Sequence, residues 1–381
     1  MKFEVFQMER MQSTYENLVQ YNLSESGVHP LTLRELLSYS GEKDEHLDVR
    51  LGYGYTNGTP ELRQLIAETY RDCKMENVLV TNGSSEANFA SIWSLINEGD
   101  EIMFMIPNYM QIGGLSRIFG ARVSHLNLRP ERNWALQTDQ LRDVISRKTK
   151  LIAICNPNNP TGAVLDKQEM MAIRDAAASA DAWVLSDEVY RGAELDGATT
   201  PSFRDIYEKT LATCGLSKAY GLPGLRIGWV AGPKEEIESI WSRHDYTTIG
   251  PSPLSDKLAR LALANSDAIL ERTRRILTDN LEVLDRWVKE HSSLLTYVKP
   301  RAGAIAFVKY ALKQNSSELV QGLREEKSLL AVPGDYFGID GYLRIGFGSE
   351  TGYLRKALDL LGDYLRKEAA KLHSAADRKR A

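Results

Sequence analysis

Cysteine and histidine are scarce in this sequence. Only three cysteines occur in 381 residues, namely Cys73, Cys155 and Cys214. They are isolated and odd in number, which argues against both a disulfide framework and a cysteine-rich zinc site. The six histidines are scattered and form no HExxH pattern, so we expect no metal ion.

Long apolar runs and an excess of one charge are also missing. No apolar segment approaches the roughly 20 residues that span a bilayer, and the initial MKFEVFQMERMQ lacks the apolar centre of a signal peptide. With 47 basic and 51 acidic side chains the net charge is -4. This balance suggests neither a nucleic-acid nor a membrane partner, and we expect a cytoplasmic protein.

The chain is long enough for two packed subdomains. Between about residues 60 and 230, short apolar segments alternate with helical patterns, which predicts an α/β fold with a mostly parallel, doubly wound sheet. The expected strands are Val78–Thr81, Ile102–Ile106, Leu151–Ile154, Trp183–Leu185 and Leu211–Thr213. Helices should begin after Thr59, where Pro60 takes the first helical position, and near Asp166, where Glu169 has capping-box spacing.

The rest of the chain predicts a second, smaller α/β domain built from both termini. Residues 253–291 have a long helical pattern, residues 295–298 and 304–308 look like strands, and residues 351–372 look like a helix. We expect residues 1–45 to be the N-terminal part of the small domain. Residues 46–285 would form the large domain, and residues 286–381 the C-terminal part of the small one.

The segment GLSKAYGLPGLRIGW (residues 215–229) places Lys218 among small residues just after a predicted strand. A desolvated lysine can lose its charge and form a Schiff base with a carbonyl group. Arg226 follows eight residues later and could meet a phosphate. Taken alone, the segment is equally compatible with a surface lysine in a glycine-rich turn.

The segment SDEVYRG (residues 186–192) places Asp187 directly after another predicted strand. A carboxylate at this end of a parallel strand points into the crevice where α/β sheets bind ligands. There it could pair with a pyridinium nitrogen, and Tyr190 could donate to a phenolate oxygen. A helix-capping aspartate and a buried tyrosine are the plainer alternative.

Two further segments follow predicted strands. CNPNNPTG (residues 155–162) reads by itself only as a tight turn. In VTNGSSEAN (residues 80–88) the chain turns at Gly83 and a helix begins at Ser84 and Ser85, which would form an anion site. A plain serine-capped helix would show the same pattern.

In this order and spacing, the four segments resemble the class I/II aminotransferases, which are pyridoxal-phosphate (PLP) enzymes of fold type I. The resemblance covers nearly the whole chain. It implies pyridoxal 5'-phosphate as cofactor, and transfer of the amino group of an L-amino acid to a 2-oxo acid through a Schiff base on Lys218. It also implies a homodimer whose active sites are shared, with Tyr55 and Thr248 supplied by the neighbouring subunit.

The resemblance assigns roles to individual residues. Lys218, Asp187 and Tyr190 would be catalytic. The residues implied to bind the cofactor are Gly83, Ser84, Ser85, Tyr109, Asn159, Asp187, Tyr190, Lys218, Arg226 and Tyr55. The residues implied to bind the substrate are Gly27, Asn159 and Arg344, where Arg344 of the YLRIGFG segment would pair with the α-carboxylate.

One position departs from the family pattern. Three residues before the Schiff-base lysine the family usually has Ser or Thr as a phosphate ligand, and here Gly215 occupies that place. One phosphate hydrogen bond should therefore be missing or supplied elsewhere.

Other functions remain open. YNLSESGVHPLTLREL (residues 21–36) weakly resembles the start of capreomycidine synthase, a PLP enzyme of the same fold that cyclises its amino acid. A lyase or cyclase is therefore the main alternative. A PLP-fold transcriptional regulator is disfavoured because no basic recognition helix is present, and a Rossmann dehydrogenase because no GxGxxG follows the first strand.

Overall fold

A seven-stranded sheet forms the centre of the computed structural model, which describes residues 3–41 and 48–378. The strand order is β2-β8-β7-β6-β5-β3-β4. The strands are β2 (Val78–Thr81), β3 (Glu101–Ile106), β4 (Arg122–Asn127), β5 (Thr149–Cys155), β6 (Trp183–Asp187), β7 (Thr210–Gly215) and β8 (Gly228–Ala231). All neighbours run parallel except β8, which is antiparallel to both β2 and β7. The predicted mostly parallel α/β sheet is confirmed.

All five predicted strands are present, as β2, β3, β5, β6 and β7. The sequence pattern misses β4 and β8. In β4, at the edge of the sheet, only Leu126 is buried, so the strand has no apolar run. Strand β8 has only four residues, all buried, and the first is a glycine. So short an apolar run cannot be distinguished in the sequence from the turn before it.

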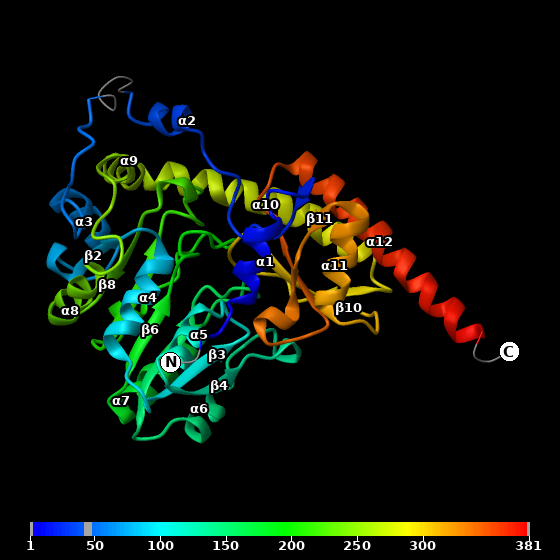
Figure 1. Ribbon diagram of the computed structural model, residues 1–381, viewed down its shortest axis with the longest axis horizontal. Coiled ribbons are helices and arrows are strands. Elements are labelled where there is room, and N and C mark those ends of the chain that lie inside the picture. Colours follow the sequence, from blue (N-terminus) through cyan, green and yellow to red (C-terminus); the bar gives the residue numbers. More distant parts are fainter. Residues whose placement is uncertain (1–2, 42–47, 379–381) are drawn as a thin grey trace.

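Helices cover both faces of this sheet (Figure 1). Leu151 and Ala153 of β5 pack into an apolar cluster with α4 (Ser84–Leu95), α5 (Gln111–Ile118) and α8 (Lys234–His244). Ile152 and Ile154 point to the other face, which is covered by α3 (Pro60–Ala67), α7 (Lys167–Ala180) and α9 (Pro253–Ala264). Burial on both faces explains why this strand reads as a continuous apolar run.

The predicted helix starts are also correct. Thr59 precedes α3 and its Oγ1 accepts the Leu62 N–H at 3.2 Å. Asp166 and Glu169 form the reciprocal capping box at the start of α7, with bonds of 2.7 and 2.8 Å. Each such cap is worth about 1 kcal/mol.

A four-stranded antiparallel sheet lies beyond the long helix α10 (Ser266–Glu290) (Figure 1). Its strands, in spatial order, are β12 (Val332–Pro333), β13 (Tyr342–Gly346), β10 (Ile305–Tyr310) and β9 (Leu295–Tyr297). Helices α11 (Ser316–Lys327) and α12 (Thr351–Arg378) accompany it. The Phe307 and Tyr342 rings stack at 4.7 Å across β10 and β13.

The N-terminal segment joins this C-terminal region. Strand β1 (Tyr21–Asn22) pairs in parallel with β11 (Leu329–Leu330). The expected boundary at residue 45 lies outside the described residues, and the one at residue 285 falls inside α10. The domain limits therefore stay predictions. The helical pattern of residues 253–291 is two helices, α9 and α10, with Asn265 between them.

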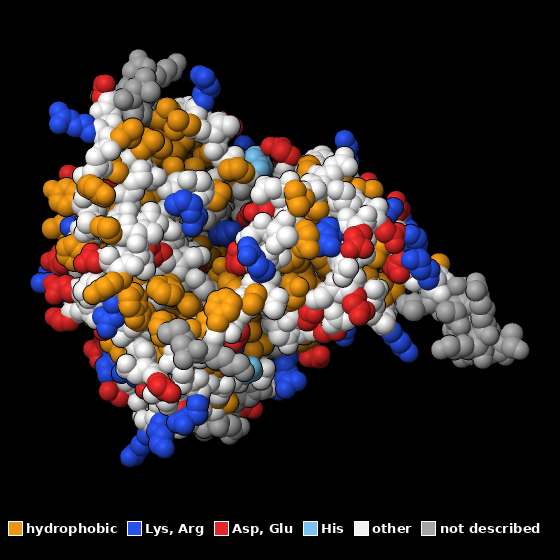
Figure 2. Space-filling view, in the orientation of Figure 1, with side chains coloured by type: hydrophobic (Ala, Val, Ile, Leu, Met, Phe, Trp, Pro, Cys, Tyr) orange, Lys and Arg blue, Asp and Glu red, His pale blue; other side chains and the backbone are white. Residues whose placement is uncertain are grey.

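Helix α1 (Gln7–Tyr15) buries Met8 and Met11 in the core cluster and lies between the two sheets (Figure 1). The remaining helices are α2 (Leu33–Ser38), α6 (Thr138–Val144) and the 3-10 helices η1 (Met75–Asn77), η2 (Pro130–Arg132), η3 (Phe203–Asp205), η4 (Pro223–Leu225) and η5 (Gly334–Phe337). Over the described part of the chain, no helix is both long and apolar enough to cross a membrane. On the face shown in Figure 2, acidic and basic side chains are interspersed.

Candidate active site

The carboxyl ends of β5, β6 and β7 open into a cavity of about 300 Å³. Cys155 and Asp187 end β5 and β6, and Lys218 follows β7 by three residues. Because the carboxyl ends of parallel strands meet at one edge of a sheet, this is where an α/β fold binds ligands. The cavity brings together most of the predicted site residues, namely Ser84, Ser85, Tyr109, Asn159, Asp187, Tyr190, Lys218, Arg226 and Arg344.

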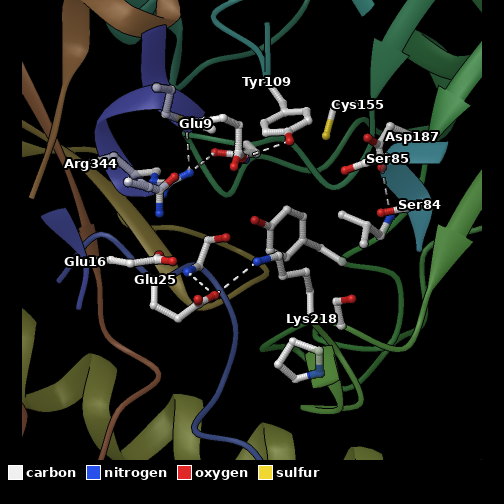
Figure 3. Close-up of a pocket in the computed structure, with 18 of the residues that line it drawn as sticks. Glu9, Glu16, Glu25, Ser84, Ser85, Tyr109, Cys155, Asp187, Lys218 and Arg344 are labelled. Carbon is white, nitrogen blue, oxygen red and sulfur yellow. Dashed lines mark hydrogen bonds and ion pairs between the residues drawn. The ribbon is translucent and has the colours of Figure 1, made fainter. Parts of the chain in front are cut away.

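Lys218 forms an ion pair inside this cavity (Figure 3). Its Nζ donates to Oε1 of Glu25 at 3.0 Å, and the same oxygen accepts the N–H groups of Ser26 and Gly27 at 2.7 and 3.0 Å. Burial is the largest single influence and lowers the pKa of Lys218, but the charge of Glu25, the neighbouring Tyr190 and the hydrogen bond to Glu25 together outweigh burial and raise that pKa above its ordinary value. The charge of Lys218 in turn lowers the pKa of Glu25 to about 2. Both groups are therefore ionised at neutral pH.

Asp187 is buried and held by fixed donors. Its Oδ2 accepts from Asn88 Nδ2 at 3.1 Å, and its Oδ1 accepts from the Val189 N–H at 3.2 Å. The Asn88 amide is oriented by Thr213, whose hydroxyl donates to Asn88 Oδ1 at 2.7 Å. Burial raises the pKa of Asp187. A buried carboxylate of this kind gains most from a cation placed against it, such as a protonated pyridine nitrogen.

An anion cradle lies at the start of α4. Gly83 has a φ of +90°, and a Cβ built on it would lie 2.1 Å from Nη2 of Arg226, so a side chain would fill the space beside the guanidinium. No side chain caps the helix, and the Ser84 and Ser85 side chains line the cavity. Ser217 adds a third hydroxyl, 3.5 Å from Arg226 Nη1. Free helix N–H groups, hydroxyls and a guanidinium fit a phosphate.

Gly215 ends β7 at a point where the backbone of β8 approaches closely. A Cβ there would lie 2.9 Å from the Ile227 carbonyl oxygen and 3.2 Å from Gly228 Cα. A serine or threonine would therefore require the β8 backbone to move. The hydroxyl expected at this position is absent, and Ser217, two residues later, offers one to the cavity instead.

Arg344 of β13 is 1% exposed and only partly paired. Its Nη1 donates to Asn159 Oδ1 at 3.1 Å, and its Nη2 to the Ser24 carbonyl oxygen. Among the described residues its Nε has no hydrogen-bond partner. Burial lowers the pKa of Arg344. A buried donor without a partner is costly, and a carboxylate would satisfy it.

Two tyrosines contribute their rings to the cavity wall. The Tyr109 hydroxyl donates to Glu9 Oε1 at 2.9 Å, and Phe6 packs edge-on against the Tyr109 ring at 5.0 Å. Tyr190 is 2% exposed. Burial raises the pKa of both hydroxyls, so both are protonated at neutral pH and can act as donors.

Gly27, Tyr55 and Thr248 are not among the residues that line the cavity. A Cβ on Gly27 would lie 3.6 Å from Lys218 Cδ, so the N-terminal segment passes directly over the lysine. Tyr55 is 59% exposed and does not line its own chain's cavity. Thr248 is exposed and its hydroxyl contacts Glu86 outside the cavity lining.

The sequence reasoning gave no role to the N-terminal polar residues of the cavity. Glu9, Gln12 and Glu16 line it from α1 and its C-cap, and Glu25 does so from the loop after β1. The spacing of residues 9, 12 and 16 puts them on one helical face, next to the face of the buried Met8 and Met11. This polar stripe is the signal that could have revealed them. Ser217 and Asn88 carry no such signal.

Comparison with known proteins identifies the family to which the chain belongs. The family model described as "Aminotransferase class I and II" matches residues 40–361. The chain belongs to this family. Pyridoxal phosphate is therefore its cofactor, and the anion cradle and the buried Asp187 fit that group.

Proteins that are similar to this chain have names that describe different reactions. Capreomycidine synthase from Streptomyces vinaceus is 30% identical over 350 residues, which cover 90% of this chain and 89% of the relative. Aspartate/prephenate aminotransferase from Thermus thermophilus is 29% identical and covers 81% of each chain.

Two solved structures are similar over almost their whole length. A PLP-dependent aminotransferase from Streptococcus suis has a TM-score of 0.92 at 36% identity, covering 97% of this chain and 99% of the other. The PLP-dependent cyclase OrfR has a TM-score of 0.90 at 27% identity, covering 96% and 98%.

Proposed function

We propose that this family member transfers the amino group of an L-amino acid to a 2-oxo acid, with Lys218 as nucleophile and proton carrier. The observation that supports this is one cavity that holds Lys218, a buried carboxylate at Asp187 and an incompletely paired guanidinium at Arg344. Pyridoxal phosphate, when bound, supplies an aldehyde for covalent attachment of the amino acid and a ring that stabilises negative charge at its Cα.

Each wall of the cavity has a separate task in this proposal. Asp187 would face the ring nitrogen, and Tyr109 would cover the ring. The phosphate would lie against Gly83, Ser84, Ser85, Ser217 and Arg226. Asn159 and Tyr190 would donate to the ring oxygen, for which Asn159 Nδ2 is available while its Oδ1 accepts from Arg344.

Lys218 then moves a proton between substrate atoms. Its amine must be neutral to take the proton from Cα, and its pairing with Glu25 opposes this. The amine therefore acts only when that ion pair is broken or weakened. Arg344 would bind the α-carboxylate through its free Nε and its Nη atoms and so orient the Cα–H bond.

A homodimer with shared active sites is part of the proposal. Tyr55 and Thr248 are exposed, and neighbouring apolar side chains are exposed as well, with Tyr53 98% and Tyr246 82% accessible. Large exposed aromatic side chains are typical of interaction surfaces. Tyr55 would reach the phosphate of the partner's site from there.

A lyase or cyclase reaction is the second candidate function, and two observations favour it. Glu25 places a carboxylate directly beside the proton carrier Lys218. The similarity to capreomycidine synthase and to a PLP-dependent cyclase covers nearly the whole chain. If the substrate carries a leaving group at Cβ, loss of that group competes with amino transfer.

A single-turnover product analysis separates the two candidates. The purified holoenzyme is mixed with a panel of L-amino acids in the absence of any 2-oxo acid, and the products are identified by mass spectrometry. Release of one equivalent of 2-oxo acid per site without free ammonia would establish amino transfer. Release of ammonia, or of a cyclic or unsaturated product over many turnovers, would assign the lyase or cyclase reaction.

A further inference from the structure

Three glutamates line one side of the cavity. Figure 3 shows Glu16 and Glu25 on the side of Arg344, away from Ser84, Ser85 and Asp187, with Glu9 above them. Glu9 and Glu16 come from α1 and its C-cap, and Glu25 comes from the following loop. This acidic wall, defined as Glu9, Glu16 and Glu25, therefore lies where a substrate side chain would extend.

The acidic wall has no cation of its own once the proposed function is assigned. Arg226 is taken by the phosphate, Arg344 by the substrate carboxylate and Lys218 by covalent chemistry. In residues 3–41 and 48–378, Glu9 and Glu16 form no ion pair with a Lys, Arg or His side chain, and the ion pair of Glu25 is the one with Lys218. Glu9 and Glu16 are partly buried and Glu25 is 52% exposed, so water solvates part of their charge. A ligand that displaces this water would be favoured if it supplies positive charge in its place.

The three carboxyl groups influence one another. Burial raises the pKa of Glu16, and the charges of Glu25 and Glu9 raise it further. They are not arranged as a metal site, since no group of three or more His, Cys, Asp or Glu side chains in the described residues could hold a metal ion. An organic cation is the ligand class that remains.

We propose that the site takes an L-amino acid with a cationic side chain, a guanidinium or an ammonium group, that lies against the acidic wall. This inference rests on the proposed function, because Arg344 must hold the α-carboxylate. The Nε of Arg344, buried and without a partner, independently indicates an anionic group at the other end of the same ligand. The cavity is thus complementary to a molecule with one anionic and one cationic end.

The same cation would act on Lys218. A guanidinium that pairs with Glu25 competes with Nζ for Oε1, the atom that now holds the lysine in its charged form. Breaking that pair leaves Lys218 free to lose its proton. Substrate binding and activation of the proton carrier would then be coupled through Glu25.

The affinities of the holoenzyme for a charged and a neutral isostere, compared with each other, test this inference. L-arginine and L-citrulline have nearly the same shape, but only arginine carries a charge on its side chain. Because the holoenzyme reacts with the amino acid that it binds, the dissociation constant is taken from the dependence of the single-turnover rate on amino-acid concentration. At pH 7.5, without a 2-oxo acid, it should be at least about 10-fold lower for L-arginine than for L-citrulline, which corresponds to about 1.4 kcal/mol. L-lysine against L-norleucine is a second pair with the same expectation.

Variants of the acidic wall show which residues distinguish arginine from citrulline. Glu16→Gln should lower the arginine-to-citrulline ratio at least about 3-fold, because Glu16 makes no hydrogen bond to Lys218 or Tyr109 and acts through its charge, while Glu9 and Glu25 remain. Glu290→Gln, at the exposed end of α10, is the matched control and should keep the wild-type ratio. Thermal unfolding of each variant checks that the fold is intact.

The outcomes distinguish this inference from the proposed function. Equal affinity for both isosteres, or a preference for citrulline or for a dicarboxylic amino acid, would overturn the cationic specificity while amino transfer stands. An unchanged ratio in Glu16→Gln would overturn the role of the acidic wall. Failure of the protein to retain pyridoxal phosphate or to bind any amino acid would overturn both.

Discussion

Nζ of Lys218 lies 3.0 Å from Oε1 of Glu25, a residue 193 positions earlier in the chain. The contact joins the N-terminal segment to the carboxyl edge of the seven-stranded sheet. It also keeps the lysine protonated, since the charge of Glu25 raises its pKa. In the proposed reaction this side chain must act as a neutral amine, so its ion pair with Glu25 would have to break once the lysine is released from its covalent bond to the cofactor.

Lys218→Ala should reduce turnover by at least about 10³-fold, because no other described lysine lines the cavity. Borohydride reduction followed by mass spectrometry should detect covalently bound cofactor in the wild type and none in the variant. Circular dichroism controls for folding. Turnover close to the wild-type value would refute the central role of Lys218.

Arg344→Ala should weaken amino-acid binding about 100-fold while cofactor affinity changes little. The reason is that charge-assisted hydrogen bonds contribute about 1.5–3 kcal/mol, and Arg344 lies on the side of the cavity away from the phosphate cradle. Calorimetry with the amino acid and fluorescence titration with the cofactor measure the two affinities separately. Arg344→Lys should fall between the two, since lysine cannot pair bidentately. Unchanged substrate affinity in Arg344→Ala would show that the carboxylate binds elsewhere.

Gly215→Ser should destabilise the protein rather than restore a phosphate ligand. Its Cβ would meet the Ile227 carbonyl oxygen at 2.9 Å, and such overpacking costs about 1–3 kcal/mol. Gly352→Ser is the control, because a Cβ at Gly352 meets no heavy atom within 4 Å, and we expect a change below about 0.5 kcal/mol. Chemical denaturation measures both. A Gly215→Ser protein with wild-type stability and tighter cofactor binding would contradict this reading of the β7–β8 contact.

Glu86→Gln should weaken cofactor binding although Glu86 does not line the cavity. Its carboxylate accepts from the Asn82 N–H at 2.7 Å and contacts His244 Nε2 at 3.0 Å and the Thr248 hydroxyl at 2.8 Å. Glu86 thereby connects the turn before the anion cradle to residues 244–248 through hydrogen bonds. We expect a loss of about 10-fold in cofactor affinity by fluorescence titration, or about 1.4 kcal/mol.

Glu290→Gln is again the control for that measurement and should bind the cofactor as the wild type does. If Glu86→Gln binds the cofactor with wild-type affinity, the turn at Asn82 and Gly83 keeps its conformation without the Glu86 side chain.

Glu188→Gln should change how stability depends on pH. Burial raises the pKa of Glu188 from 4.5 to about 7, so between these values the folded state binds more protons than the unfolded state. The contribution of Glu188 to the free energy of unfolding therefore falls as pH rises from 4.5 to 7 and stays low above 7. The variant lacks this loss and should gain about 2–3 kcal/mol relative to wild type between pH 5 and pH 8. If the difference in free energy of unfolding between variant and wild type is the same at pH 5 and at pH 8, the prediction is wrong.

The sequence by itself determined the parts of the site that depend on short segments. Asp187 ends one buried strand and Lys218 follows another, so the apolar runs before them were enough to place both side chains at one edge of the sheet. The Gly83 turn, the start of α4 and the capping box of α7 are equally local. The order of these segments along the chain was sufficient to recognise the family.

Only the tertiary structure decided which distant side chains meet. Glu25 reaches Lys218, Glu9 reaches Tyr109, and Asn88 reaches Asp187 across 193, 100 and 99 positions. No periodicity encodes these contacts, because they depend on how α1, α4 and the loop after β1 pack against the sheet. The space denied to a side chain at Gly215 likewise depends on the neighbouring strand β8. The chemistry of each segment depends on contiguous residues, whereas the charge balance of the cavity depends on packing between elements that are far apart in the chain.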